Sequence, residues 1–194
     1  MEKKIRKFLN TKLLAKDIKY IEKVESTQTE AKKLAEQGTE NGTLVITNNQ
    51  TNGMGTQNRK WISSEGKNIT FTLILYPKCK LTALDSLTID IAKCLVDSIS
   101  SLYGYELYIK SPNDIMYNNK KMGGILTQVV TSGEKIKYLL IGIGMNINEI
   151  NFPNEIKDIA TSMAIEFEKT FSREEILGEF LNRFEKYCEE KGIV

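Results

Sequence analysis

The chain has 194 residues, 41% of them hydrophobic, which is enough for a single domain (residues 1–194) with a substantial core. Its 27 Lys and Arg side chains against 25 Asp and Glu give a formal net charge of +2, which argues against a dedicated nucleic-acid-binding protein. The sequence contains no histidine, which excludes Ser-His-Asp triads, histidine general bases and imidazole metal sites.

The three cysteines, Cys79, Cys94 and Cys188, are far apart in the sequence. Their odd number and their spacing fit neither a zinc site nor a disulfide framework, and they favour a reducing, cytoplasmic setting. Cys94 lies in an apolar helical pattern, so we expect it in the core. No apolar stretch is long enough to cross a membrane, and the first residues lack a secretory signal, so we expect no membrane contact.

The first predicted elements are one helix and two strands. The helix is expected to begin at Thr27 as N-cap, with Glu30 as its capping-box partner, and to stop at Gly38. Residues 43–47 and 68–76 are rich in β-branched and aromatic residues and predict strands.

The central predicted helix carries apolar residues at helical spacing from residue 84 to 102, and Gly104 is its stop signal. Thr82 and Asp85 offer a cap for its start. Residues 105–110 then predict a further strand.

Residues 124–131 and 135–143 predict two strands joined by a hairpin turn at Ser132 and Gly133. A last helix is predicted to begin with a capping box at Ser172. Because strands outnumber helices and hairpins outnumber βαβ units, we expect an α+β fold with a mixed, largely antiparallel sheet flanked by helices.

A glycine-rich segment from residue 53 to 61 contains Gly53 and Gly55, followed by Arg59 and Trp61. No predicted helix opens directly after it and no GKS or GKT sequence is present, so it is neither a Rossmann nor a Walker loop. An arginine can bind phosphate bidentately, and a tryptophan can stack on a flat base. The segment therefore predicts a phosphate- and base-binding loop. The alternative is a long loop with two glycines at positive φ and a tryptophan that anchors the core.

A second segment combines cations, oxygen ligands and small residues: Lys110, Asn113, Asp114, Lys121, Gly123 and Gly124. A lysine between two anionic groups stabilises both of them, and Asn113 and Asp114 offer oxygen ligands that suit Mg²⁺. Lys110 is expected either to contact phosphate or to pair with Asp114. An ordinary Ser-Pro-Asn-Asp turn is the alternative.

A third segment has Gly142, Gly144 and Asn146 at the end of a predicted strand. Small, flexible backbone beside amides suits a phosphate-bearing ligand held against main-chain N–H groups. The alternative is a central strand whose glycines admit close packing of a neighbour.

Together, in this order and at this spacing, the three segments resemble the catalytic domain of biotin–protein ligases. The first resembles the family's Gly-Arg-Gly-Arg-x-Gly-Arg-x-Trp loop through its two first glycines, its last arginine and its tryptophan. The second resembles the Lys-Trp-Pro-Asn-Asp signature and its downstream lysine, and the third resembles a Gly-x-Gly-x-Asn run. The resemblance extends from about Tyr20 to Cys188.

The resemblance implies which residues face biotin. Ser26 and Thr27 match a Ser-Thr pair that faces biotin in the family. Thr51 aligns with a family glutamine that also faces biotin, and Gln50 is its neighbour in this chain.

The resemblance also implies the surroundings of the adenylate. Adenylation brings a carboxylate against a triphosphate, and Lys121 is predicted as the lysine that stabilises both anions where they meet. In the family the glycine-rich loop folds over biotinyl-adenylate, which puts Arg59 at the ATP phosphates and Trp61 against adenine. Gly142 and Gly144 would border the biotin ring, and Asn146 would lie near the ATP phosphates.

The sequence departs from the family pattern at several positions. Met54 and Thr56 replace two arginines, Asn58 replaces a glycine, and Ser111 replaces a tryptophan. Each lost charge-assisted hydrogen bond to the acyl phosphate is worth roughly 1.5–3 kcal/mol. No helix-turn-helix sequence precedes the matched region, so DNA binding is not expected. The chain stops at Val194, where many members continue into a small SH3-like domain.

The resemblance thus implies a biotin/lipoate ligase catalytic domain, related in fold to class II aminoacyl-tRNA synthetases. It implies ATP, Mg²⁺ and biotin as reactants, a biotinyl-adenylate intermediate, and transfer to a lysine of a biotin carboxyl-carrier protein. Family members often dimerise through the sheet, so a homodimer is one expectation. The alternatives are a lipoate or octanoate ligase or transferase on the same fold, a degraded paralogue that binds biotin or a nucleotide without turnover, and an unrelated α+β domain.

Overall fold

A seven-stranded sheet forms the centre of the molecule, with the strand order β1-β2-β5-β9-β8-β7-β6. The computed structural model describes residues 1–194 apart from the side chain of Asn58. The outer strand β1 (Ile18–Val24) pairs in parallel with β2 (Leu44–Gln50), and the other pairings of this sheet are antiparallel. The predicted α+β class with a mixed, largely antiparallel sheet is therefore confirmed.

The remaining strands of the main sheet are β5 (Ile69–Leu75), β6 (Tyr108–Lys110), β7 (Asp114–Tyr117), β8 (Lys120–Ser132) and β9 (Lys135–Met145). A separate small hairpin consists of β3 (Gly53–Met54) and β4 (Lys60–Trp61).

The helices are α1 (Glu2–Ile5), α2 (Thr27–Glu36), α3 (Leu87–Tyr103), α4 (Met163–Phe167) and α5 (Arg173–Glu190). Short 3-10 turns occur at η1 (Arg6–Phe8), η2 (Thr56–Asn58) and η3 (Leu81–Leu84).

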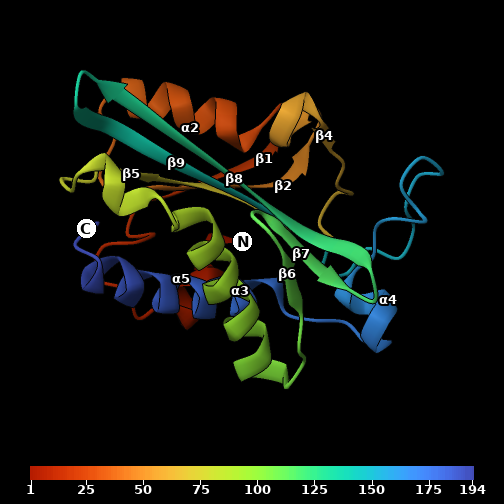
Figure 1. The fold of residues 1–194 in the computed structure, drawn as a ribbon. Helices are drawn as coiled ribbons and strands as arrows, with labels where there is room; N and C mark the ends of the chain where they lie inside the picture. The colour runs from red at the N-terminus through yellow and green to blue at the C-terminus, as the bar shows by residue number, and fades with distance from the viewer.

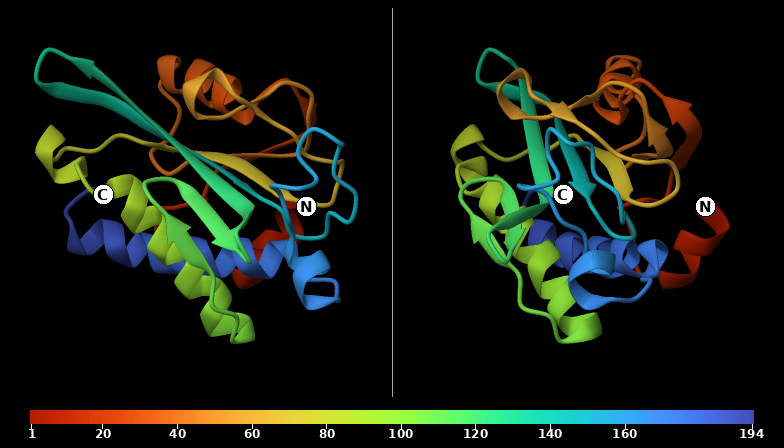
Figure 2. Two further views of the ribbon diagram at one scale, coloured as in Figure 1. Left: turned by 45° about the vertical axis from the view of Figure 1, so that its right-hand side comes forward. Right: turned by 90° about the vertical axis from the view of Figure 1, so that its right-hand side faces the viewer.

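Helices cover both faces of the sheet (Figures 1 and 2). The long helices α3 and α5 pack against each other on one face, above the larger core that contains Phe71, Ile91 and Phe180. Helix α2 lies on the opposite face, over a smaller core that contains Ala31 and Ile74. The β3–β4 hairpin lies on this second face as well, so one face is a fully packed core and the other is shared between α2 and a loop.

The structure corrects two predicted helix starts. Ser26, not Thr27, is the N-cap of α2: its Oγ accepts a hydrogen bond from the Gln28 backbone N–H at 3.2 Å. The central helix begins at Leu87 without a side-chain cap, because Thr82 belongs to the preceding 3-10 turn and Asp85 ends it. The predicted stop is confirmed, since Gly104 ends α3 in the left-handed conformation at φ 73°.

The strand predictions need three further corrections. The predicted strand over 105–110 is shorter, and β8 begins before the predicted residue 124. Strands β1 and β7 were not predicted, because each mixes charged and apolar residues too irregularly for a clear period-two pattern.

The predicted N-cap of the last helix is confirmed, because Ser172 Oγ accepts a hydrogen bond from the Glu175 backbone N–H.

Cys94 is buried in the larger core, as predicted. Desolvation raises the pKa of its thiol to about 11, so the side chain behaves as an apolar core residue near neutral pH. No helix in the described part of the chain has the length and apolar character needed to cross a membrane.

Candidate active site

The sheet register sets two rows of small and polar residues on the α2 face. Thr72 of β5 pairs with Gly142 of β9, which pairs with Leu126 of β8. Two residues along, Thr70 pairs with Gly144, which pairs with Gly124. Because side chains two residues apart in a strand point to the same face, both rows line one surface. The glycines leave that surface hollow.

The start of α2 supplies the polar side of this hollow. Gln50, at the end of β2, accepts hydrogen bonds at Oε1 from the Thr27 backbone N–H at 2.8 Å and from Thr27 Oγ1 at 3.1 Å. Thr72 Oγ1 lies 3.0 Å from Thr27 Oγ1. Ser26, Thr27, Gln50 and Thr72 are all buried, so this polar cluster is already bonded within the protein.

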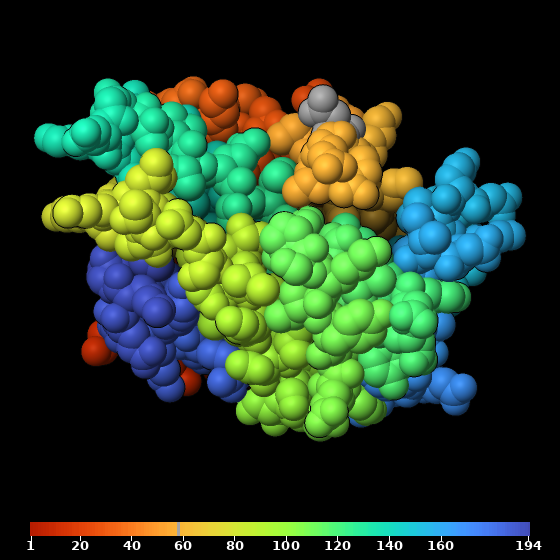
Figure 3. All heavy atoms as spheres, in the orientation of Figure 1, coloured from red at the N-terminus to blue at the C-terminus, as the bar shows by residue number. Residues whose placement is uncertain are grey.

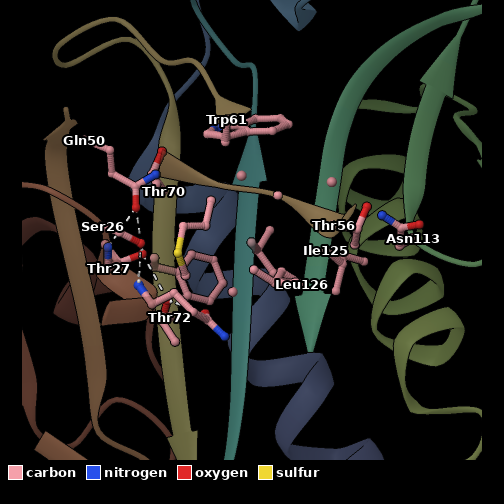
Figure 4. Close-up of a pocket in the computed structure, with 18 of the residues that line it drawn as sticks. Ser26, Thr27, Gln50, Thr56, Trp61, Thr70, Thr72, Asn113, Ile125 and Leu126 are labelled. Atoms are coloured by element: carbon pink, nitrogen blue, oxygen red, sulfur yellow. Dashed lines mark hydrogen bonds between the residues drawn. The ribbon is translucent and has the colours of Figure 1, made fainter. Parts of the chain in front are cut away.

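These groups form one end of a pocket of about 430 Å³, part of it open to solvent, which we name the first compartment. Figure 4 shows the polar cluster on one side, Ile125 and Leu126 on the other, and the Trp61 ring above the space between them. The first compartment thus combines a polar end with an apolar wall, a typical arrangement for a small-molecule site.

The glycine-rich segment closes over this compartment as the β3–β4 hairpin, where Gly53 pairs with Trp61. Figure 3 shows this hairpin against the segment that carries β6 and β7. The alternative of two glycines at positive φ is wrong: Gly55 has φ −118°, and Gly53 is not among the positive-φ glycines. Gly53 is required by close approach, because a Cβ there would lie 2.5 Å from the Trp61 carbonyl oxygen.

Trp61 also explains the glycine at position 144. A Cβ on Gly144 would lie 2.3 to 2.6 Å from atoms of the Trp61 indole ring. The tryptophan therefore rests directly on the backbone of β9, and its Nε1 is buried without a hydrogen-bond partner among the described residues. Trp61 thus forms a wall of the first compartment, and it belongs to neither hydrophobic core.

A second compartment of about 730 Å³, also partly open to solvent, lies on the other side of Trp61. Its walls include Ile62, Ile156 and Ile159, and the last of these is 63% exposed. Asn146 is buried at its edge, where Nδ2 donates to the Thr161 carbonyl at 3.0 Å. Asn146 Oδ1 has no partner among the described residues, so an apolar space with an unused acceptor is open to a flat ligand.

Lys121 and Trp61 line both compartments. Lys121 Nζ lies 5.8 Å from the centre of a Trp61 ring and 2.6 Å from Asp114 Oδ1. The ammonium group therefore stands where the two compartments meet, and its charge is held there by a partly buried carboxylate.

The structure shows which lysine pairs with Asp114, a point that the sequence left open. Its partner is Lys121, whereas Lys110 is exposed and lies opposite Asp114 only in backbone register. Asn113 Nδ2 donates to Asp114 Oδ1 at 3.2 Å, so both side chains belong to one network around Lys121. Ser111 and Pro112 do form a turn, and this turn holds the network at the site.

The fit of these residues to Mg²⁺ is limited to two oxygen donors. In the described part of the chain, no cluster of three or more Cys, Asp or Glu side chains has the geometry of a metal site. Mg²⁺ commonly binds proteins through one or two carboxylates plus substrate phosphates. Asn113 and Asp114 fit that pattern, in which most of the ligands come from a nucleotide and water.

Most of the predicted site residues come together around the two compartments. The first is lined by Ser26, Thr27, Gln50, Gly55, Trp61, Asn113, Lys121, Gly124, Gly142 and Gly144, and the second by Gly55, Arg59, Trp61, Lys121 and Asn146.

Several predicted residues lie elsewhere. Thr51 is exposed and lines neither compartment, whereas its neighbour Gln50 lines the first. Gly123 faces the core, where a Cβ would lie 2.5 Å from Met145 Sδ. Arg59 does line the second compartment, but it is exposed there, and its Nη2 donates to Thr56 Oγ1 at 3.0 Å.

The sequence reasoning missed Gln28, Thr70 and Thr72, which all line the first compartment. Thr70 and Thr72 stand two residues apart in a strand that was predicted, and polar residues at every second position of an otherwise apolar strand were the signal available. Gln28 follows the Ser-Thr pair directly, and only the position of α2 over the sheet reveals its role.

The fold and site define a class of protein: an α+β domain in which a polar-ended pocket and a larger, mainly apolar pocket meet at one lysine. Residues 20–146 match the Biotin/lipoate A/B protein ligase family. The chain belongs to this family, as its three sequence segments indicated.

Curated relatives cover much of the chain. It is 37% identical over 187 residues to the bifunctional ligase/repressor BirA of Bacillus subtilis. The matched region covers 95% of this chain and 58% of that protein. It is 34% identical over 127 residues to the biotin–[acetyl-CoA-carboxylase] ligase of Paracoccus denitrificans, with 64% of this chain and 52% of that protein covered. The chain thus spans less than two thirds of the length of these relatives.

Solved structures agree on the fold. A biotin protein ligase from Aquifex aeolicus in complex with biotin and ATP gives a TM-score of 0.76 at 29% identity, covering 92% of this chain and 74% of that one. A biotin protein ligase from Leishmania major in complex with biotinyl-5-AMP gives a TM-score of 0.74 at 25% identity, covering 90% of this chain and 76% of that one.

Proposed function

We propose that this chain is the catalytic domain of an ATP-dependent biotin–protein ligase, a biotin–[biotin carboxyl-carrier protein] ligase. In the first step a biotin carboxylate oxygen attacks the α-phosphorus of ATP, and pyrophosphate leaves. In the second step the ε-amine of an acceptor lysine attacks the acyl carbon of biotinyl-5′-AMP; AMP leaves and the nitrogen loses a proton. The names of the relatives support biotin over other acids.

The observation that carries the proposal is the shared wall of the two compartments. Lys121 and Trp61 line both, so an acid in the first compartment and a nucleotide in the second would meet at the Lys121 ammonium. Two anions repel each other as they approach, and a cation between them offsets this repulsion and the charge that develops at the α-phosphate. Asp114, at 2.6 Å, keeps the ammonium in place.

The first compartment suits biotin. Its buried end, with Ser26, Thr27 and Gln50, offers hydrogen bonds to a ureido ring, and Ile125 and Leu126 offer an apolar wall to the aliphatic chain. A plain acyl chain would leave the polar end without ligand partners, which costs free energy when water is excluded.

The second compartment suits the adenine and ribose of ATP. The Trp61 ring and the isoleucines Ile156 and Ile159 offer flat apolar contacts to a base. The unused Asn146 Oδ1 accepts a hydrogen bond, such as one from an exocyclic amine. Arg59, which lines this compartment, would contact phosphate after exchanging its hydrogen bond to Thr56.

Mg²⁺ would enter with the nucleotide and neutralise phosphate charge, and Asn113 and Asp114 would be the side chains that hold it. The β3–β4 hairpin covers the first compartment and would limit the access of water to the mixed anhydride. With histidine absent from the sequence, the acceptor amine must lose its proton to another group or to water.

The proposal is tested by mass spectrometry of the purified chain incubated with biotin, ATP and Mg²⁺, with and without a biotin carboxyl-carrier domain. We expect biotinyl-5′-AMP in the first mixture and a biotinylated carrier in the second. Parallel mixtures contain lipoate or octanoate in place of biotin, or lack ATP. Adenylate formation only with lipoate or octanoate would contradict the proposal, as would no product in any mixture when a known ligase succeeds under the same conditions.

A further inference from the structure

Behind the polar end of the first compartment, four buried oxygen atoms stand in a row. Gln50 Oε1 lies 3.1 Å from Thr27 Oγ1, which lies 3.0 Å from Thr72 Oγ1, which lies 3.1 Å from Oε1 of Gln28. All four residues are 9% exposed or less. The row connects the loop end of the pocket to the first turn of α2 (Figure 4 shows its first three residues).

This row has fewer protons than contacts. Its three contacts need three hydrogen atoms, but a carboxamide oxygen only accepts, and each of the two threonine hydroxyls has one proton. One contact would therefore bring two lone pairs together in a buried site, which is unfavourable. Turning the Gln28 carboxamide by half a rotation brings Nε2 to Thr72 and supplies the missing proton.

The surroundings of Gln28 allow that orientation. Its other amide atom then faces Gln128, at 3.2 Å, and the side chain of Gln128 is exposed and free to turn its own nitrogen inward. Gly142 lies underneath, where a Cβ would come within 2.5 Å of the Gln28 carboxamide. Because Gly142 has no side chain, the Gln28 amide can lie close to the row.

We infer that Gln28 is a positioning residue that directs the hydrogen bonds of this row from Gln28 through Thr72 and Thr27 to Gln50. Both threonine protons then point along the row, so the pocket side of Thr27 and Thr72 presents lone pairs. Ser26 Oγ already accepts the Gln28 backbone N–H, which leaves its own proton for a ligand.

The polar end would therefore offer acceptors at the threonines and a donor at Ser26. A ligand ring with N–H groups beside a carbonyl satisfies both kinds of group, and an apolar ring or chain satisfies neither. Gln28 would thus contribute to the choice of acid through the hydroxyls of Thr72 and Thr27. This inference rests on the proposed function, because it takes biotin as the acid.

The test compares Gln28→Met with Gln28→Glu. Methionine has a similar volume and no amide, so we expect biotin affinity to fall about 2- to 10-fold at every pH, the range for one hydrogen bond. Glutamate donates to Thr72 only when protonated, and burial raises its pKa. Biotin affinity of Gln28→Glu should therefore rise as the pH is lowered from 8.5 to 5.5. The neighbours Thr72, Gln128 and Gly142 on β5, β8 and β9 carry no charge.

Titration calorimetry of the full chain gives the biotin affinity, and competition gives that of octanoic acid, which has the same carboxylate but no N–H group. We expect Gln28→Met to bind octanoic acid as the wild type does, and Gln28→Glu to bind it with an affinity that does not depend on pH. Thr72→Val should lose as much biotin affinity as Gln28→Met. Thr72→Ser should keep most of the wild-type affinity because it retains the hydroxyl.

The outcomes separate this inference from the proposed function. Wild-type chain that does not bind biotin overturns both. Wild-type chain that binds biotin, with Gln28→Met and Gln28→Glu within twofold of it at all pH values, overturns the inference alone. Equal losses of affinity for biotin and octanoic acid also overturn it, because they indicate structural damage. Circular dichroism and the thermal midpoint show whether each variant is folded.

Discussion

The two compartments differ in how far the protein has already satisfied its own polar groups. In the first, Ser26, Thr27 and Gln50 are hydrogen-bonded to one another or to the start of α2. In the second, the buried Asn146 Oδ1 has no partner among the described residues. The polar groups of the first compartment are thus already bonded within the protein, whereas the second has an acceptor left free for a ligand.

This difference predicts a division of labour. An arranged site loses little entropy on binding and selects strictly for shape and polarity. An open apolar site with a few unused polar atoms accepts a common cosubstrate and becomes ordered around it. Substitutions should therefore separate into those that affect the acid, those that affect the nucleotide, and those at the shared wall that affect both.

The largest effect is expected at the shared wall. Lys121→Ala removes the cation between the two compartments and leaves Asp114 without its 2.6 Å partner. Adenylate formation should fall by about 10²- to 10³-fold, the usual cost of losing one preorganised electrostatic contact. The measurement is the rate of biotinyl-5′-AMP formation, with Lys120→Ala as the matched control. A Lys121→Ala rate near that of the wild type would remove Lys121 from the mechanism.

Trp61→Ala should weaken both ligands, because the ring lines both compartments. Loss of an aromatic platform against a base costs about 1–3 kcal/mol. Calorimetric titrations with biotin and with ATP measure the two effects separately, and Trp61→Phe is the control that keeps an aromatic ring. Weakening of one ligand alone would show that Trp61 belongs to a single compartment.

Asn146→Ala tests the second compartment by removing its unused acceptor. ATP affinity should fall by about 0.5–1.5 kcal/mol, the worth of one hydrogen bond, while biotin affinity without ATP stays as in the wild type. The same calorimetric titrations apply. If biotin binding weakens as much as ATP binding, the loss of the Asn146 bond to the Thr161 carbonyl has disturbed the strand end, and the compartments are not independent.

The smallest effect on ligand binding is expected for Gly142→Ala in the first compartment, where the main loss is of stability. Its new Cβ would meet the Gln28 carboxamide at 2.5 Å, and overpacking of this kind costs about 1–3 kcal/mol of stability, less where the side chain can shift. We expect a lower thermal midpoint and slightly weaker biotin binding. The double variant Gly142→Ala, Gln28→Ala should recover part of the midpoint, since the clash is gone. Strictly additive losses would mean that the two residues do not touch.

The amino-acid sequence predicted much of the architecture, because several elements have strong local signals. The apolar period of α3 and the Gly104 stop located that helix, and the β-branched run of β5 located a buried interior strand. Local signals were weaker for β1 and β7, whose mixed side chains reflect an outer strand and a short second strand next to the sheet edge. Such strands are defined by their neighbours in the sheet more than by their own residues.

For the site, the sequence identified the residues with distinctive chemistry: the lysine at 121, the aspartate at 114, and the loop with its tryptophan. Tertiary structure decided which of their possible partners they meet. It paired Asp114 with Lys121 and not with Lys110, it brought Gln50 and not Thr51 to the pocket, and it assigned Gly142 to Gln28.

The physical reason lies in the range of the interactions. Caps, turns and apolar periods act within a few residues, so they can be read along the chain. The pocket depends on register across three strands, where Thr72, Gly142 and Leu126 are aligned although they are far apart in sequence. Only the folded sheet, with α2 placed over it, brings the Gln28 amide to Thr72 and makes one polar end out of three separate segments.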